Sequence, residues 1–178
     1  SCAGGANVNV TFNIEREALK GEVIKISVSN LLGGHSGMEI IKQRANAIKL
    51  LGRILSAVKA EQSVHIVSIA GGSKHNAIAK EAQAIITVED AARAQTAIAK
   101  LAEAIKAEYR VADKDIRIAA EAATALPKMM YNGTVSCGII DFMTMVPDGV
   151  QYMSMDIPGL VQTSLNNGIH HGSLFNIG

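Results

Sequence analysis

The chain has 178 residues, 48 % of them hydrophobic, which is enough for one compact domain with a proper core or for two small subdomains that share a sheet. Lys and Arg number 17 and Asp and Glu number 16, so there is no electrostatic case for nucleic acid or an acidic membrane as a partner. Aromatic residues make up 3 % and Trp is absent, which weakens an RNA-binding interpretation. Cys2 and Cys137 lie far apart in the sequence and form no disulfide framework, so a reduced, cytoplasmic location is expected.

The first segments alternate between apolar and polar residues, which is the period of a half-buried strand. The alternation predicts one strand over residues 7–14. After a turn at Gly21, it predicts a second strand that places Ile24, Ile26 and Val28 on its inner face.

The next segment runs through Gly33-Gly34-His35-Ser36-Gly37 into an apolar helical pattern. Ser36 and Glu39 have the spacing of a capping box, which satisfies free N–H groups where a helix begins. We therefore expect a helix over residues 37–59, with His35 just outside its N-terminus and beside the positive end of the helix dipole. A neutral imidazole in that place could contact a substrate carbonyl or an anion, or could merely cap or fill the loop.

The rest of the chain continues to alternate between strand and helix patterns. The pattern predicts strands over 64–69, 84–88 and 116–120, a helix from 89 to about 110, a joint at 126–133, a helix that begins near Thr134 and runs to about 146, and a strand pair over 150–157 and 160–169. This order predicts an α+β fold, in which helices cover one face of an antiparallel sheet.

Four motifs, in order along the chain, resemble one known family. They are Gly-Gly-His-Ser-Gly at 33–37 with Arg-Ala-Asn-Ala at 44–47, Gly-Gly-Ser-Lys-His-Asn-Ala-Ile at 71–78, Pro-Asp-Gly-Val at 147–150, and Thr-Ser-Leu-Asn at 163–166. The series resembles the lid domain of the aminoacyl-histidine dipeptidase (peptidase D, Xaa-His dipeptidase) family, which are cytosolic zinc metallopeptidases of the aminoacylase/carnosinase superfamily. The resemblance covers almost the whole chain, and the ordered series is far more specific than any single motif.

The resemblance also implies a domain organisation. Residues 1–125 would form a ferredoxin-like lid subdomain, and residues 126–178 a helix plus strand pair that is part of a second, similar subdomain. The second half repeats the order of elements but no sequence. Because the chain begins without Met, we expect a fragment of a longer protein, with the zinc catalytic domain absent from this chain.

The metal-binding signature of the family is not found in this sequence. That signature is a His-x-Asp segment with a Glu-Glu pair, whereas the only acidic pair here, Glu89-Asp90, begins a predicted helix. None of the five His residues has an Asp two positions later: they are His35, His65, His75, His170 and His171. We therefore expect no metal site and no hydrolysis by this chain alone, while the resemblance implies two zinc ions in the full-length enzyme.

The resemblance assigns two site residues. His35 would reach into the active site of the zinc catalytic domain, in dimeric relatives that of a neighbouring subunit, polarise the scissile carbonyl of an Xaa-His-type dipeptide and stabilise the oxyanion. Asn76 would bind the substrate backbone through its amide donor and acceptor, or would only cap its own turn.

The other polar residues in these motifs have no assigned chemistry. His75 is expected to be exposed to solvent. His170 and His171 point to opposite faces of a strand, so they cannot chelate together, and we expect them at the surface or at a junction. Asn166 belongs to a stretch that resembles the family, but no role follows for it.

Two other functions stay open. The chain could be a non-catalytic oligomerisation module that pairs protomers through a sheet edge or helix, which is compatible with a lid and with a homodimer. It could also be a small-molecule or anion-binding regulatory domain in which residues 33–37 cradle a phosphate at a helix N-terminus. The lack of Lys or Arg beside that loop argues against the second alternative.

Overall fold

The computed structural model describes residues 4–123, 127–172 and 174–177. Within these residues a seven-stranded antiparallel sheet has the order β1-β13-β12-β5-β7-β3-β8. Its strands are β1 (Val8–Thr11), β3 (Glu22–Ser29), β5 (Val64–Gly71), β7 (Ala82–Val88), β8 (Arg117–Ala122), β12 (Asn167–His171) and β13 (Leu174–Ile177).

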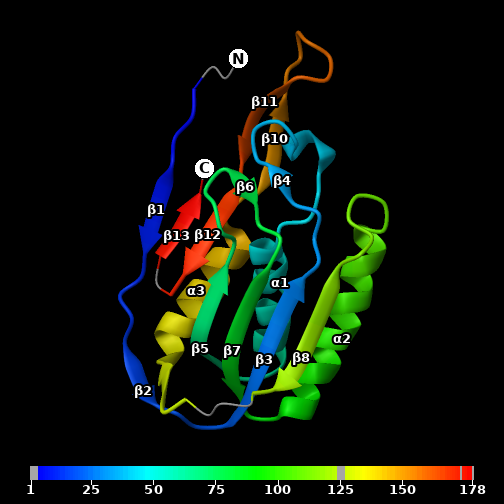
Figure 1. Ribbon diagram of the computed structural model, residues 1–178. Coiled ribbons are helices and arrows are strands. Elements are labelled where there is room, and N and C mark those ends of the chain that lie inside the picture. Colours follow the sequence, from blue (N-terminus) through cyan, green and yellow to red (C-terminus); the bar gives the residue numbers. More distant parts are fainter. Residues whose placement is uncertain (1–3, 124–126, 173, 178) are drawn as a thin grey trace.

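Helices α1 (Ala47–Glu61), α2 (Ala91–Glu108) and α3 (Gly133–Met145) lie on one face of this sheet (Figure 1). The central helix, α1, packs on β3, β5 and β7 and against both other helices. On β3, Ile24, Ile26 and Val28 are buried beneath the helices, while Lys25 between them is exposed, as the alternation predicted. No helix among the described residues is long and apolar enough to cross a membrane.

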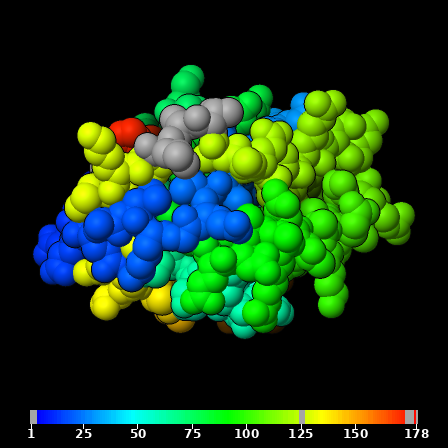
Figure 2. All heavy atoms as spheres, turned by 90° about the horizontal axis from the view of Figure 1, so that it is seen from below, coloured from blue at the N-terminus to red at the C-terminus, as the bar shows by residue number. Residues whose placement is uncertain are grey.

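Shorter elements cover the two ends of the sheet. They are η1 (Ile40–Lys42) and three strand pairs, β2 (Arg16–Ala18) with β9 (Met129–Tyr131), β4 (Gly34–His35) with β6 (Ala77–Ile78), and β10 (Gly149–Met153) with β11 (Val161–Leu165). The β4–β6 pair and the β10–β11 hairpin lie at one end (Figure 1). At the opposite end, the chain around β2 crosses the surface beside β9 (Figure 2).

The α+β fold class, with helices on one face of an antiparallel sheet, is confirmed. The strand predicted over 160–169 is two strands, because the chain leaves the hairpin at Asn166 and enters the main sheet as β12. There β12 pairs with β5, so strands from both halves of the chain share one sheet. The predicted boundary after residue 125 falls at residues 124–126, which lie outside the described residues, and the division into two subdomains stays a prediction.

The predicted start of the first long helix is wrong. Helix α1 begins at Ala47 rather than Gly37, and Asn46 is its N-cap: the Asn46 Oδ1 accepts from the backbone N–H of Ile48 at 3.0 Å. Residues 37–46 instead form η1 and turns. The predicted N-cap of α3 is also wrong. This helix is capped by Asn132 and not by Thr134.

Candidate functional site

His35 lies on β4, which pairs with β6 so that His35 is opposite Ala77 and Gly34 is opposite Ile78. Its side chain is exposed, as expected. The helix terminus that was expected beside it is not there, because α1 begins at Ala47. The local environment of His35 is therefore a closed loop and not the end of a helix dipole.

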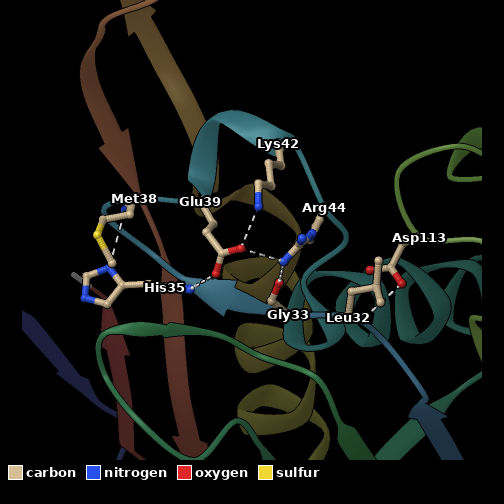
Figure 3. Close-up of polar contacts among 8 residues, drawn as sticks. All are labelled: Leu32, Gly33, His35, Met38, Glu39, Lys42, Arg44 and Asp113. Carbon is tan, nitrogen blue, oxygen red and sulfur yellow. Dashed lines mark hydrogen bonds and ion pairs between the residues drawn. The ribbon is translucent and has the colours of Figure 1, made fainter.

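The imidazole of His35 is oriented by its own loop. Its Nδ1 accepts a hydrogen bond from the backbone N–H of Gly37 at 3.0 Å. It also accepts one from the backbone N–H of Met38 at 3.3 Å, which Figure 3 shows. A ring nitrogen that accepts carries no proton, so the proton of the neutral ring is on Nε2. The exposed edge of the ring therefore presents a hydrogen-bond donor.

Glu39 closes the loop around His35 (Figure 3). Its Oε2 accepts the backbone N–H of His35 at 2.9 Å, and its Oε1 accepts from Lys42 Nζ at 2.8 Å and from Arg44 Nη1 at 3.2 Å. Arg44 also donates to the carbonyl of Gly33. The hydrogen bond from Lys42, then that from His35 and the two positive charges, lower the pKa of Glu39 to about 2, so this carboxylate is ionised at neutral pH.

Gly34 is required for this close packing. Its φ of +141° is a conformation that favours glycine, and a Cβ there would lie 2.6 Å from Glu39 Oε2 and 2.9 Å from Arg44 Nη1. Any side chain at this position would push the carboxylate and the guanidinium away from the backbone of the loop. The lack of a side chain at Gly34 thus serves the close approach of the Glu39–Arg44 ion pair.

Asn76 lies next to His35 in space, because the Ser36 N–H donates to the Asn76 carbonyl at 3.0 Å. His35 and Asn76 line one open pocket of about 830 Å³ on the sheet side of the β4–β6 pair. The Asn76 side chain is exposed and makes no hydrogen bond with any described residue. The two residues that the resemblance singled out are therefore brought together, with a donor from one and an unengaged amide from the other.

A buried polar cluster contacts the same loop, and the sequence analysis did not recognise it. It consists of the buried Asn46, Asn166 and Asn167 and the half-buried Asp148. Burial raises the pKa of the Asp148 carboxyl, although the hydrogen bonds from Asn167 oppose this. The only sequence signal for the cluster was that three of its members fall in motifs that resemble the family.

The remaining histidines lie apart from His35. His75 is exposed, as expected. The expectation that His170 lies at the surface is wrong: it is 2 % exposed on β12, between β5 and β13, whereas His171 is exposed on the opposite face. Burial lowers the pKa of His170 to about 3, and its Nε2 lies 3.2 Å from the carbonyl oxygen of Gly172.

Neither a metal nor a phosphate fits the residues of this loop. Across the described parts of the chain, no three His, Cys, Asp or Glu side chains are grouped so that they could hold a metal ion. The phosphate hypothesis needed a helix N-terminus after Gly37, which the structure does not have. The argument against it also changes, because Lys42 and Arg44 do lie beside the loop, but both are bound to Glu39.

Known proteins are similar to this chain in sequence and in fold. Residues 26–113 match the sequence model of the peptidase dimerisation domain. The cytosol non-specific dipeptidase of Escherichia coli (strain K12) is 31 % identical over 172 residues, which are 94 % of this chain and 35 % of that protein. The crystal structure of aminoacylhistidine dipeptidase from Vibrio alginolyticus is similar with a TM-score of 0.88 and 29 % identity, covering 96 % of this chain and 36 % of that one.

The chain thus spans about a third of the length of each of these two relatives. The match to the domain model, the sequence identity to the first relative and the similar fold of the second all point to the same proteins as the series of motifs in the sequence. Residues 26–113 therefore carry the peptidase dimerisation domain, and the homologues of the chain are dipeptidases, which confirms the resemblance.

Proposed function

We propose that this chain is the lid and dimerisation domain of a cytoplasmic dipeptidase, and that it acts on substrate held by a metal-binding catalytic domain outside this chain. The names of the two homologues support dipeptides as the substrate class, with Xaa-His dipeptides among them. The motif resemblance implies that the catalytic domain binds two zinc ions. The described residues of this chain offer no site for them.

In this proposal His35 is the catalytic residue of the lid. Its Nε2–H donates to the oxygen of the scissile carbonyl, and this hydrogen bond strengthens as negative charge develops on that oxygen in the transition state. The two backbone N–H groups on Nδ1 hold the ring in one tautomer and one orientation, so little reorganisation is needed at the moment of reaction. This fixed donor is the observation on which the proposal depends.

Asn76 has the second role. Its amide can donate to a peptide carbonyl and accept from a peptide N–H, which fits a substrate whose recognisable groups are those of the backbone. Because the amide is exposed in the pocket that His35 lines, the two side chains can contact the same small molecule. His35 then acts on the reacting carbonyl and Asn76 orients the remainder of the dipeptide.

The test uses the full-length protein with His35→Ala and His35→Asn. In the second variant, the amide oxygen can replace Nδ1 as the acceptor for the loop, while the Nε2 donor is lost. Both variants should lower kcat by about 10²–10³ with a smaller change in KM. The control is His171→Ala, which removes an exposed imidazole on β12. Unchanged turnover in His35→Asn would contradict the role of the donor.

The match to the peptidase dimerisation domain also supports a homodimer formed through this chain. Sedimentation velocity on the 178-residue chain at increasing concentration should show a reversible dimer. If the isolated chain stays monomeric while the full-length protein is dimeric, the contact between subunits lies elsewhere, and the lid role of His35 is unaffected.

A further inference from the structure

We propose that Asn166 is a positioning residue for this site: its buried amide holds the backbone on both sides of Asn76 and, through the β4–β6 pair, the backbone of His35. The inference rests on the proposed function of His35 and Asn76. It assigns a role to a residue that touches neither substrate nor metal.

The first observation is the pair of hydrogen bonds that Asn166 donates. Asn166 is 2 % exposed, and its Nδ2 donates to the carbonyl of Ala77 at 2.9 Å and to that of His75 at 3.2 Å. These two carbonyls come immediately after and immediately before Asn76. Both donors of the amide are thus engaged, and the backbone is tied to one buried side chain at the residue before Asn76 and at the residue after it.

The second observation is that the direction of this amide is set by helix α1. The Asn46 Oδ1 caps the helix by accepting from Ile48 N–H and Lys49 N–H, so the Asn46 Nδ2 points away from the helix. That Nδ2 donates to the carbonyl of Asn167 at 2.9 Å and to the Asp148 Oδ1 at 3.1 Å, and its third and longest contact is with the Asn166 Oδ1 at 3.4 Å. A flipped Asn166 would place an oxygen against two carbonyl oxygens, so one orientation alone satisfies its partners.

The third observation is the close packing of the turn on the start of β12. A Cβ on Gly168 would lie 2.7 Å from the carbonyl oxygen of His75 and 2.8 Å from the Cα of His75. A Cβ on Gly72, whose φ is +65°, would lie 1.9 Å from the Gly168 carbonyl oxygen. The turn therefore rests directly on the backbone of β12, two residues beyond Asn166, and has no room to shift toward it.

The connection to His35 is made through the backbone. Ser36 N–H donates to the Asn76 carbonyl at 3.0 Å, and His35 pairs with Ala77. A displacement of residues 75–77 therefore moves both Asn76 and the strand that carries His35. A misplacement of about 1 Å of groups that contact a reacting substrate can lower the rate by about 10²-fold, which is why a buried amide at this place is relevant to turnover.

The test compares three variants of the full-length protein. Asn166→Ala removes the amide, and Asn166→Asp keeps nearly the same shape and an acceptor for Asn46 but places a carboxylate oxygen against the two carbonyls. The matched control is Asn167→Ala, because Asn167 is also buried, at 3 % exposure, and its side chain bonds to Pro147 and Asp148 but not to residues 75–77.

Both Asn166 variants should lower kcat by about 10- to 100-fold, while Asn167→Ala should lower Tm by a similar amount and leave kcat within about 3-fold of the parent. The Ser36 amide hydrogen should exchange at least about 10-fold faster in the Asn166 variants and not in the control. If Asn166→Ala fails to fold, Asn166→Asp and the exchange measurement still decide the matter. An unchanged kcat in Asn166→Asp overturns the inference.

A double-mutant cycle with Asn76→Ala separates this inference from the proposed function. Because Asn166 acts through Asn76 and His35, the loss of kcat in the double variant should be smaller than the product of the two single losses. Full multiplicativity overturns the inference and leaves the proposed function standing. If His35→Ala and Asn76→Ala leave kcat unchanged, the proposed function fails, and the inference fails with it.

Discussion

The helix-covered face of the sheet and the loops at residues 33–46 and 73–77 are built from different interactions. On the sheet face, alternate residues of each strand and one stripe of each helix exclude water, and the contacts between these apolar groups are nondirectional. In the loops, each contact joins a particular donor to a particular acceptor, as between Glu39 and the His35 N–H or Asn166 and the Ala77 carbonyl. Apolar burial sets where the elements lie, and the polar contacts set the geometry of the site.

The two regions also differ in how far apart in sequence their determinants lie. The alternation that buries β3 is contained in eight consecutive residues. The amide that holds residues 75–77 belongs to Asn166, and the Asn46 that orients it is 120 residues away from it. A change in the first region should therefore act on stability alone, and a change in the second should act on turnover with a smaller effect on stability.

The largest expected effect on stability comes from the first region. Leu51 is a fully buried residue of α1 and belongs to the hydrophobic core. Leu51→Ala should lower the free energy of unfolding by about 2–5 kcal/mol, because it removes buried methyl groups and leaves a cavity. Urea denaturation measures this loss. The kcat of the folded full-length variant should stay unchanged, and a large drop in kcat would show that the two regions are not separable.

The elements of the first region could be predicted from the sequence because the apolar pattern of each one lies within a few consecutive residues. Strands β3, β5 and β7 were predicted because their apolar period is local, and α2 follows Asp90, whose Oδ1 accepts the Arg93 N–H. The start of α1 was predicted wrongly because Ser36 with Glu39 and Asn46 are both good helix starts by local chemistry. The choice is made by Glu39, which binds Arg44 and closes a loop.

The burial of His170 could not be predicted from the sequence either. Its strand is the penultimate one in the chain, where a surface position is common. In the structure β12 lies inside the sheet, because it pairs with β5 along one edge and with β13 along the other. Strand β5 comes much earlier in the sequence. Strand order across a sheet depends on nonlocal pairing, which no period in the sequence encodes.

His170 offers a pH test of the sheet. Burial lowers its pKa in the folded protein to about 3, from 6.5 in the unfolded chain, so the unfolded state binds more protons between these values. The free energy of unfolding should therefore fall as the pH decreases from 6.5 toward 3, by up to about 1.4 kcal/mol per pH unit. Urea denaturation at a series of pH values measures this change. In His170→Gln the unfolding free energy should vary less with pH between 6.5 and 3 than in the parent. The comparison variant His171→Ala removes the exposed neighbour, whose charge is the smallest cause of the lowered pKa of His170, and should change the pH dependence less than His170→Gln does.

The smallest effect on stability is expected at the loop, where Glu39→Gln removes an ionised carboxylate. Because the pKa of Glu39 is lowered to about 2 from 4.5, its contribution to stability is complete above pH 4.5 and is lost as the pH falls toward 2, a lower window than that of His170. The difference in unfolding free energy between parent and Glu39→Gln should therefore shrink between pH 4.5 and pH 2.

The same variant tests whether the loop serves turnover. Glu103→Gln is the matched control, since Glu103 forms a similar exposed ion pair with Lys106 three residues later, at 2.9 Å against 2.8 Å for Glu39 and Lys42. At pH 7 we expect kcat of the full-length protein to fall several-fold in Glu39→Gln and to stay unchanged in Glu103→Gln. The reason is that Glu39 also accepts from the backbone N–H of His35 and from the guanidinium of Arg44, whereas Glu103 accepts from Lys106 on the same helix, α2. Equal turnover in both variants would mean that the imidazole keeps its orientation through Gly37 and Met38 alone.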